Sequence, residues 1–136
     1  MKKRQKERVK TKGKRGALFW VPRIISILFI LFLTLFSFDV FGSGNSIWLE
    51  LVGFVIHSLP SIVLIVILIF AWRNSLILSI PFLGFGLWYL TMMIARAFLS
   101  SSISWYIAIS WSLTIALPAL LVGVLFLLDW ILRKKN

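Results

Sequence analysis

Long apolar runs alternate with short polar breaks along this chain. A membrane-spanning helix needs about 20 consecutive apolar residues, and four runs reach that length, at about 17–38, 47–72, 75–99 and 105–132. Membrane strands would show alternating segments of about ten residues, whereas these runs are apolar on all sides. Because the connections are short, neighbouring helices should be antiparallel. The pattern predicts an all-α membrane protein, an antiparallel four-transmembrane-helix bundle over residues 17–136.

Residues 1–16 form a basic tail before the first run. The first 15 residues hold nine Lys or Arg and one Glu, and the basic positions would fall on every side of a helix. We therefore expect a disordered tail whose partner is the anionic headgroups of the bilayer, at about 1 kcal/mol per basic residue. Aromatic residues that could stack on bases are missing from the tail, so no specific nucleic-acid partner is expected.

The composition excludes several classes of function. Only 14% of the residues are charged, against about a quarter in soluble domains, so a soluble domain is excluded. The chain has no cysteine and one histidine, which rules out disulfides, thiolate chemistry and a poly-histidine metal site. With no readable nucleophile–base pair, metal cluster or phosphate loop, we expect neither an enzyme nor a cofactor nor a metal.

The basic residues also predict an orientation. If both termini are cytoplasmic, 14 of the 15 Lys and Arg residues fall on the cytoplasmic side, as the positive-inside rule favours. The first apolar run is too long for the 7–15-residue core of a signal peptide, so we expect it to be retained. The expected location is the cell membrane, as a multi-pass protein.

Charged residues lie near the predicted helix ends. They fall into two sets: Asp39, Glu50 and Arg96 at the outer ends, and Arg23, Arg73 and Asp129 at the inner ends. A lone charge at membrane depth costs about 2.5–3.5 kcal/mol even on the lenient insertion scale. We therefore expect Arg96 to pair with Glu50 or Asp39. Likewise, Asp129 should pair with Arg23 or Arg73, and such pairs would join helix ends.

A polar seam on the second span contains His57. It lies ten residues into its helix, about 15 Å deep and near the midplane. Glu50 is about 10 Å away along the same face, too far for direct contact. Two interpretations stay open. His57 is a neutral residue bonded to a neighbour such as Ser61 or Tyr89, or these four residues belong to a proton or ligand site.

Each predicted span contains one proline. Pro22 should lie in the first turn of its helix, where proline is tolerated. The interior prolines Pro60, Pro81 and Pro118 should kink their helices or free a carbonyl.

Several stretches resemble a known family. They are residues 22–33 (PRIISILFILFL), 38–41 (FDVF), 57–61 (HSLPS) and 71–73 (AWR), with a fourth apolar span that ends in Trp130 and basic residues. Together they resemble small prokaryotic membrane proteins defined only by a domain of unknown function. The resemblance covers about residues 20–135, leaves out the tail, and implies a four-span fold without an assigned activity.

Two function classes remain. The first is a structural or accessory subunit that packs with itself or with a membrane partner, and it requires no catalytic constellation. The alternative is a small transporter or channel subunit with His57 and Glu50 on a proton or cation path, which at this size would need to be a homo-oligomer.

Overall fold

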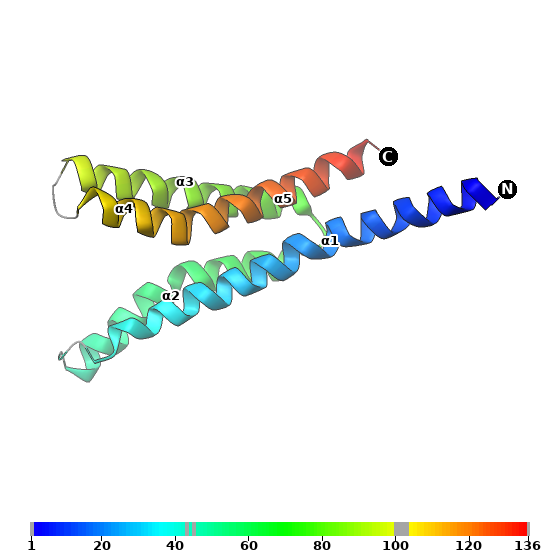
Figure 1. Ribbon diagram of the computed structural model, residues 1–136. Helices are drawn as coiled ribbons and strands as arrows, with labels where there is room; N and C mark the ends of the chain where they lie inside the picture. Colours follow the sequence, from blue (N-terminus) through cyan, green and yellow to red (C-terminus); the bar gives the residue numbers. More distant parts are fainter. Residues whose placement is uncertain (1, 43, 45, 100–103, 136) are drawn as a thin grey trace.

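The computed structural model describes residues 2–42, 44, 46–99 and 104–135, and its ordered elements there are all helical (Figure 1). In chain order they are α1 Lys2–Ser37, a short 3-10 turn η1 Phe38–Val40, α2 Ile47–Phe70, α3 Ser75–Leu99, α4 Trp105–Trp111, a π-helical segment η2 Ser112–Ala116, and α5 Leu117–Lys134. Within this part of the chain, four helices are long and apolar enough to cross a membrane, and α4, η2 and α5 together make the fourth. The predicted all-α, four-span fold is thereby confirmed.

The first helix starts earlier than expected. It begins at Lys2, so helix α1 includes the basic segment as well as the first apolar run. Lys, Arg, Gln and Glu are good helix formers, and a helix already nucleated by the apolar span extends at little cost. Pro22 consequently lies inside a 36-residue helix rather than in its first turn.

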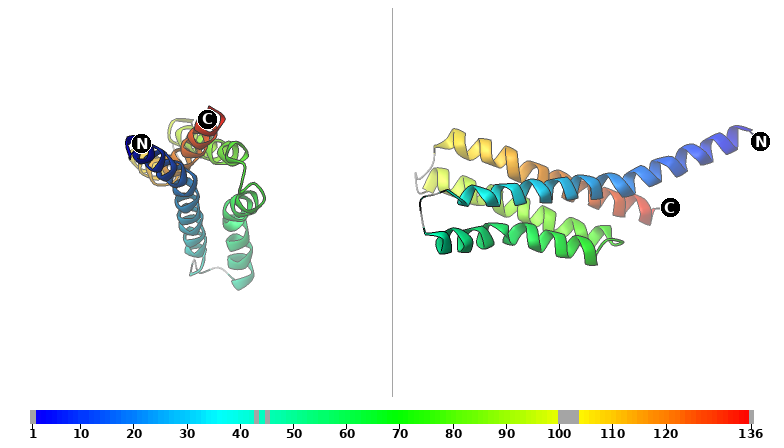
Figure 2. Two further views of the ribbon diagram at one scale, coloured as in Figure 1. Left: turned by 90° about the vertical axis from the view of Figure 1, so that its right-hand side faces the viewer. Right: turned by 90° about the horizontal axis from the view of Figure 1, so that it is seen from below.

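The helices are arranged as two antiparallel hairpins. The first hairpin is α1 with α2, and the second is α3 with α4, η2 and α5. They meet at the termini end, which holds both chain termini and the corner at 71–74. They diverge toward the loop end, near residues 38–42 of the first hairpin and 99 and 104–105 of the second (Figures 1 and 2). Helix α3 packs on α5 and, toward the loop end, on η2 and α4, and α1 joins the hairpins by packing on α5.

The hydrophobic core explains why the hairpins meet at the termini end. Its buried members come from all four spans: Phe29, Ile30, Leu33, Leu64, Leu68, Ala71, Leu78, Phe82, Ala119, Val122 and Phe126. Phe82 lies at the centre, with its ring centroid 6.3 Å from that of Phe29 and 5.8 Å from that of Phe126. Many large apolar side chains elsewhere are exposed, as in a protein that faces lipid.

Two glycines bring α3 and α5 into close contact. A Cβ placed on Gly86 would lie 2.7 Å from Leu120 Cγ and 3.1 Å from the carbonyl oxygen of Ala116. On Gly123 it would lie 2.6 Å from Leu83 Cγ and 2.9 Å from the Leu83 nitrogen. Only a residue without a side chain allows this approach, which is how small residues work at membrane helix interfaces.

The fourth span contains the π-helical segment immediately before Pro118. The amide of Leu117 donates to the carbonyl of Ser112, five residues earlier, instead of four. Since proline has no N–H, the helical pattern is interrupted there in any case, and the extra residue is accommodated as a π-bulge. The expected effect of Pro118 thus takes the form of a bulge one turn N-terminal to it.

Candidate functional site

A buried arginine joins all four spans at the termini end. Arg23 on α1 is 0% exposed. Its Nε and Nη2 donate to the carbonyl oxygen of Trp72, at 3.1 and 2.6 Å, and Nη1 donates to the carbonyl of Phe19. The Trp72 carbonyl belongs to the corner that follows α2, where helix carbonyls lack intrahelical donors. A cation at that position is favoured by the helix dipole as well.

The anionic partner of Arg23 is Asp129 on α5. Arg23 Nη1 lies 3.6 Å from Asp129 Oδ2, and Asp129 is only 1% exposed. The same carboxylate accepts a short hydrogen bond from the hydroxyl of Ser75, at the first turn of α3, and its Oδ1 accepts one from Nε of Arg133 at 2.9 Å. We call the buried residues Arg23, Ser75 and Asp129, together with Arg133, which is 45% exposed, the buried polar cluster. Its groups bond one another, so it holds helix ends together.

Aromatic rings surround this cluster. The guanidinium carbon of Arg23 lies 3.6 Å from the centroid of the Phe19 ring, and that of Arg133 lies 4.5 Å from it. The ring of Phe126 is 5.5 Å from the Arg23 guanidinium carbon. Ring faces attract cations, so two positive side chains can share one carboxylate in an apolar setting.

The structure brings together some of the charged residues expected at the inner helix ends. Asp129 lies with Arg23, whereas Arg73 is exposed and outside the cluster. Sequence reasoning missed Ser75 and Arg133. Arg133 stands one helical turn after Asp129, and this i, i+4 spacing is a signal that could have found it.

At the loop end the charged residues take separate places. Glu50 is 9% exposed, and its Oε1 accepts a hydrogen bond at 3.1 Å from the amide of Gly42. Gly42 has a positive φ of 85°, which suits glycine. Glu50 thus fastens the turn between α1 and α2. Asp39 lies exposed in η1, and Arg96 is exposed near the end of α3.

The four residues of the predicted polar seam do not converge. His57 is exposed, and its Nδ1 lies 2.9 Å from the carbonyl oxygen of Gly53 on its own helix. Ser61 is buried, and its hydroxyl has no hydrogen-bond partner among the described residues. Tyr89 packs its ring against Phe85 on α3, with centroids 6.2 Å apart. The expected hydrogen bond from His57 to Ser61 or Tyr89 is not formed.

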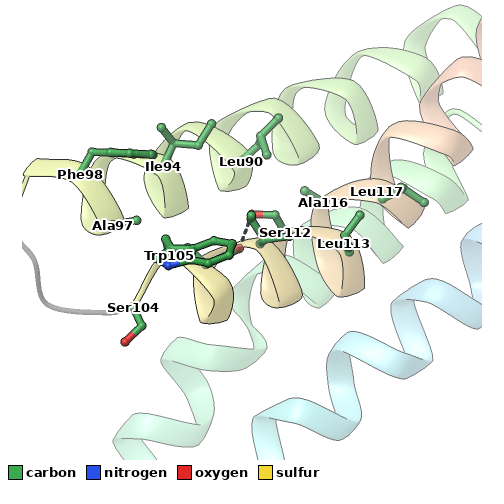
Figure 3. A pocket seen from close by; sticks show the side chains of 12 residues that line it. Leu90, Ile94, Ala97, Phe98, Ser104, Trp105, Ser112, Leu113, Ala116 and Leu117 are labelled. Carbon is green, nitrogen blue, oxygen red and sulfur yellow. Dashed lines mark hydrogen bonds between the residues drawn. The ribbon is translucent and has the colours of Figure 1, made fainter.

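An apolar groove of about 890 Å³ lies between α3 and the α4–η2 part of the fourth span (Figure 3). None of the polar-seam residues lines it. Across the described residues, no three His, Cys, Asp or Glu side chains gather to hold a metal ion.

One family model matches residues 8–136, and its description is a domain of unknown function, DUF7670. The chain belongs to the DUF7670 family. The match begins within the basic segment, so the DUF7670 domain takes in more of the N-terminus than the resemblance over residues 20–135 implied. No curated protein and no solved structure matches the chain at a significant level. The family description assigns no activity, and the four candidate membrane spans come from the structure.

Proposed function

We propose that this DUF7670 protein is a non-enzymatic accessory subunit that binds a transmembrane helix of a partner protein through the exposed side of α2. The observation that carries the proposal is the state of His57. It lies near the middle of the 24-residue helix α2 and is exposed there. Of the four spans, α2 is also the least buried within the protein, since only 22% of its most apolar 18-residue stretch is buried.

The hydrogen bond of His57 fixes what it can offer to a partner. The Gly53 carbonyl only accepts, so Nδ1 carries the proton in this contact. With Nδ1 as the donor, Nε2 of the neutral ring is an acceptor, and the exposed position of His57 leaves it within reach of a neighbouring helix. A second copy of His57 in the same state would offer another acceptor, so self-pairing at this residue is unfavourable. A partner helix with an O–H or N–H group at mid-depth is complementary, and such bonds join membrane helices.

A transport path receives less support from the same residues. Glu50 accepts a hydrogen bond from the amide of Gly42, and His57 donates one to the carbonyl of Gly53. Neither lines the groove between α3 and the fourth span. The buried polar cluster also bonds to itself and to the backbone, as expected for groups that hold helices together.

We also propose a cell-membrane location with both termini in the cytoplasm, where the basic N-terminal segment and residues 133–135 meet anionic headgroups. Both termini lie at one end of the helices (Figure 1), which is compatible with this orientation. Since the chain has no cysteine, single cysteines placed at Ser46 and Arg73 can be labelled from outside intact cells. We expect label at Ser46 only, and the reverse result would overturn the orientation.

The accessory role is tested by purifying the full-length protein from its native membrane after photo-crosslinking. We expect a stoichiometric membrane partner whose recovery falls about fivefold with His57→Ala, since one interhelical hydrogen bond contributes roughly 1 kcal/mol. His57→Gln, which keeps an acceptor, should retain the partner. Thr91→Ala is the matched control, because Thr91 is an exposed polar residue whose hydroxyl bonds its own helix at Trp88.

Two outcomes would contradict the accessory role. The first is recovery of the protein without a partner, or only with a second copy of itself. The second is proton or cation flux in liposomes that is lost in His57→Ala and Glu50→Gln, which would favour the transporter interpretation.

A further inference from the structure

The groove between α3 and the fourth span is apolar and open to the surface. Its α3 wall runs from Leu90 to Phe98, and its other wall runs from Trp105 to Leu117 (Figure 3). Phe98 and Trp105 are 76% and 66% exposed, and Leu117 at the other end is 50% exposed. Because these lining residues are half-exposed or more, the space opens onto the side of the helices that faces lipid.

The groove ends where α3 and α5 come into close contact. Gly86 lies one turn before Leu90, and a Cβ there would already crowd Leu120 and the carbonyl of Ala116. Toward the loop end, the larger residues Leu90, Ile94 and Phe98 line the α3 wall, and the facing wall includes the π-helical segment. The two walls are therefore closest at mid-span, and beyond it α3 and α4 pack with the groove between them.

The length of the groove indicates what fits it. At 1.5 Å per residue, Leu90 to Phe98 extends over about 12 Å and Trp105 to Leu117 over about 18 Å. The hydrocarbon core is about 30 Å thick, so the groove is about as deep as one leaflet. A transmembrane helix crosses both leaflets and would meet the closed α3–α5 contact halfway. A lipid chain occupies one leaflet only.

We propose that this groove binds one acyl chain of a phospholipid from the leaflet at the loop end. Trp105 lies at its mouth, and tryptophan favours the level of the lipid headgroups because its ring is apolar and its N–H is polar. The volume of about 890 Å³ falls within the usual range for small-molecule sites. The proposal is independent of the partner of α2, which concerns another helix.

Native mass spectrometry of the full chain, purified in mild detergent with added phosphatidylcholine, tests the groove. The wild type should retain one phospholipid under activation that removes loosely attached lipid. Ala97→Phe, which fills the groove from α3, should lose it. Ala95→Phe is the matched control, because Ala95 is on the same helix and does not line the groove. Leu113→Trp fills the groove from a position that is 56% exposed, where folding is less affected.

A phosphatidylcholine with a photoreactive diazirine in its chain then locates the contact in vesicles. Crosslinks should concentrate on the groove walls in the wild type and decrease there in both filled variants. Equal retention of lipid by the wild type and the filled variants would overturn the proposal. Crosslinks spread evenly over all exposed helices would overturn it too, as would a groove crosslinked to a second copy of the chain.

Discussion

Replacing Asp129 by alanine removes the carboxylate on which the buried polar cluster depends. Arg23 would stay 0% exposed with no anion beside it, and the hydroxyl of Ser75 would lose its acceptor. The bonds from Arg23 to the Trp72 carbonyl would remain. Since the lost ion pair links α1 of one hairpin to α5 of the other, the change should weaken the junction of the two hairpins.

The size of the effect follows from the geometry. At 3.6 Å and an effective dielectric constant of about 20, the attraction between Arg23 and Asp129 is roughly 5 kcal/mol. Desolvation of both charges offsets much of that in the intact pair, but removing one partner leaves the other charge buried and uncompensated. We therefore expect Asp129→Ala to lower the free energy of unfolding by about 3–5 kcal/mol.

The measurement is unfolding in mixed micelles with increasing SDS, followed by circular dichroism and tryptophan fluorescence. Arg73→Ala is the control, because Arg73 is a basic residue near the same helix ends but is exposed and outside the cluster. It should leave the midpoint nearly unchanged. The double variant Arg23→Met with Asp129→Leu should recover part of the loss, since no charge is left buried. Recovery is incomplete because the Trp72 carbonyl loses its donors.

Two results would refute this reasoning. One is an Asp129→Ala midpoint equal to that of Arg73→Ala, which would mean that the cluster contributes nothing to holding the hairpins together. The other is a double variant no more stable than Asp129→Ala alone, which would mean that the uncompensated charge is not the cause of the loss.

Three backbone predictions use the same unfolding measurement or a distance. Gly123→Ala should lower the free energy of unfolding by about 1–3 kcal/mol, because the added methyl group would overpack against Leu83. Gly84→Ala should raise it by up to about 1 kcal/mol, because a methyl group there meets nothing within 4 Å and alanine favours the helix. Equal effects of the two changes would contradict the close α3–α5 contact. Pro118→Ala restores a backbone amide, so the π-helical segment should become regular α-helix and α4 should rotate by about 100° about its axis. The distance between spin labels on α3 and α4, placed across the groove, measures this rotation. An unchanged distance would show that Pro118 does not cause the π-helical segment. Gly42→Ala should cost about 1–2 kcal/mol because φ there is +85°, and an unchanged midpoint would argue against that turn.

Much of the fold followed from local features of the sequence. Each run of about 20 apolar residues had to be a helix, because the backbone must satisfy its own hydrogen bonds in lipid. The predicted runs at 75–99 and 105–132 agree closely with the helices Ser75–Leu99 and Trp105–Lys134. The prediction that Asp129 pairs with Arg23 or Arg73 also required only the depth of each residue in the membrane and the sign of its charge. In the structure Asp129 lies beside Arg23.

Contacts between helices were beyond such reasoning. The spacing of small and polar residues put His57 on the same face as Ser61, yet His57 is exposed and Ser61 is buried. A helical seam is buried only where a neighbouring helix covers it, and the periodicity of one helix carries no information about how far its neighbours diverge.

The sequence by itself determined the number of spans, the limits of the last two, and the need of Asp129 for a basic partner. The tertiary structure decided that the hairpins meet at the termini end and diverge at the loop end, because the four-span core and the Arg23–Asp129 pair lie at one end only. It also decided where the groove opens, because glycines close the α3–α5 contact at mid-span and larger residues separate the walls beyond it. Apolar runs look alike along a chain, and only packing distinguishes the faces that meet protein from those that meet lipid.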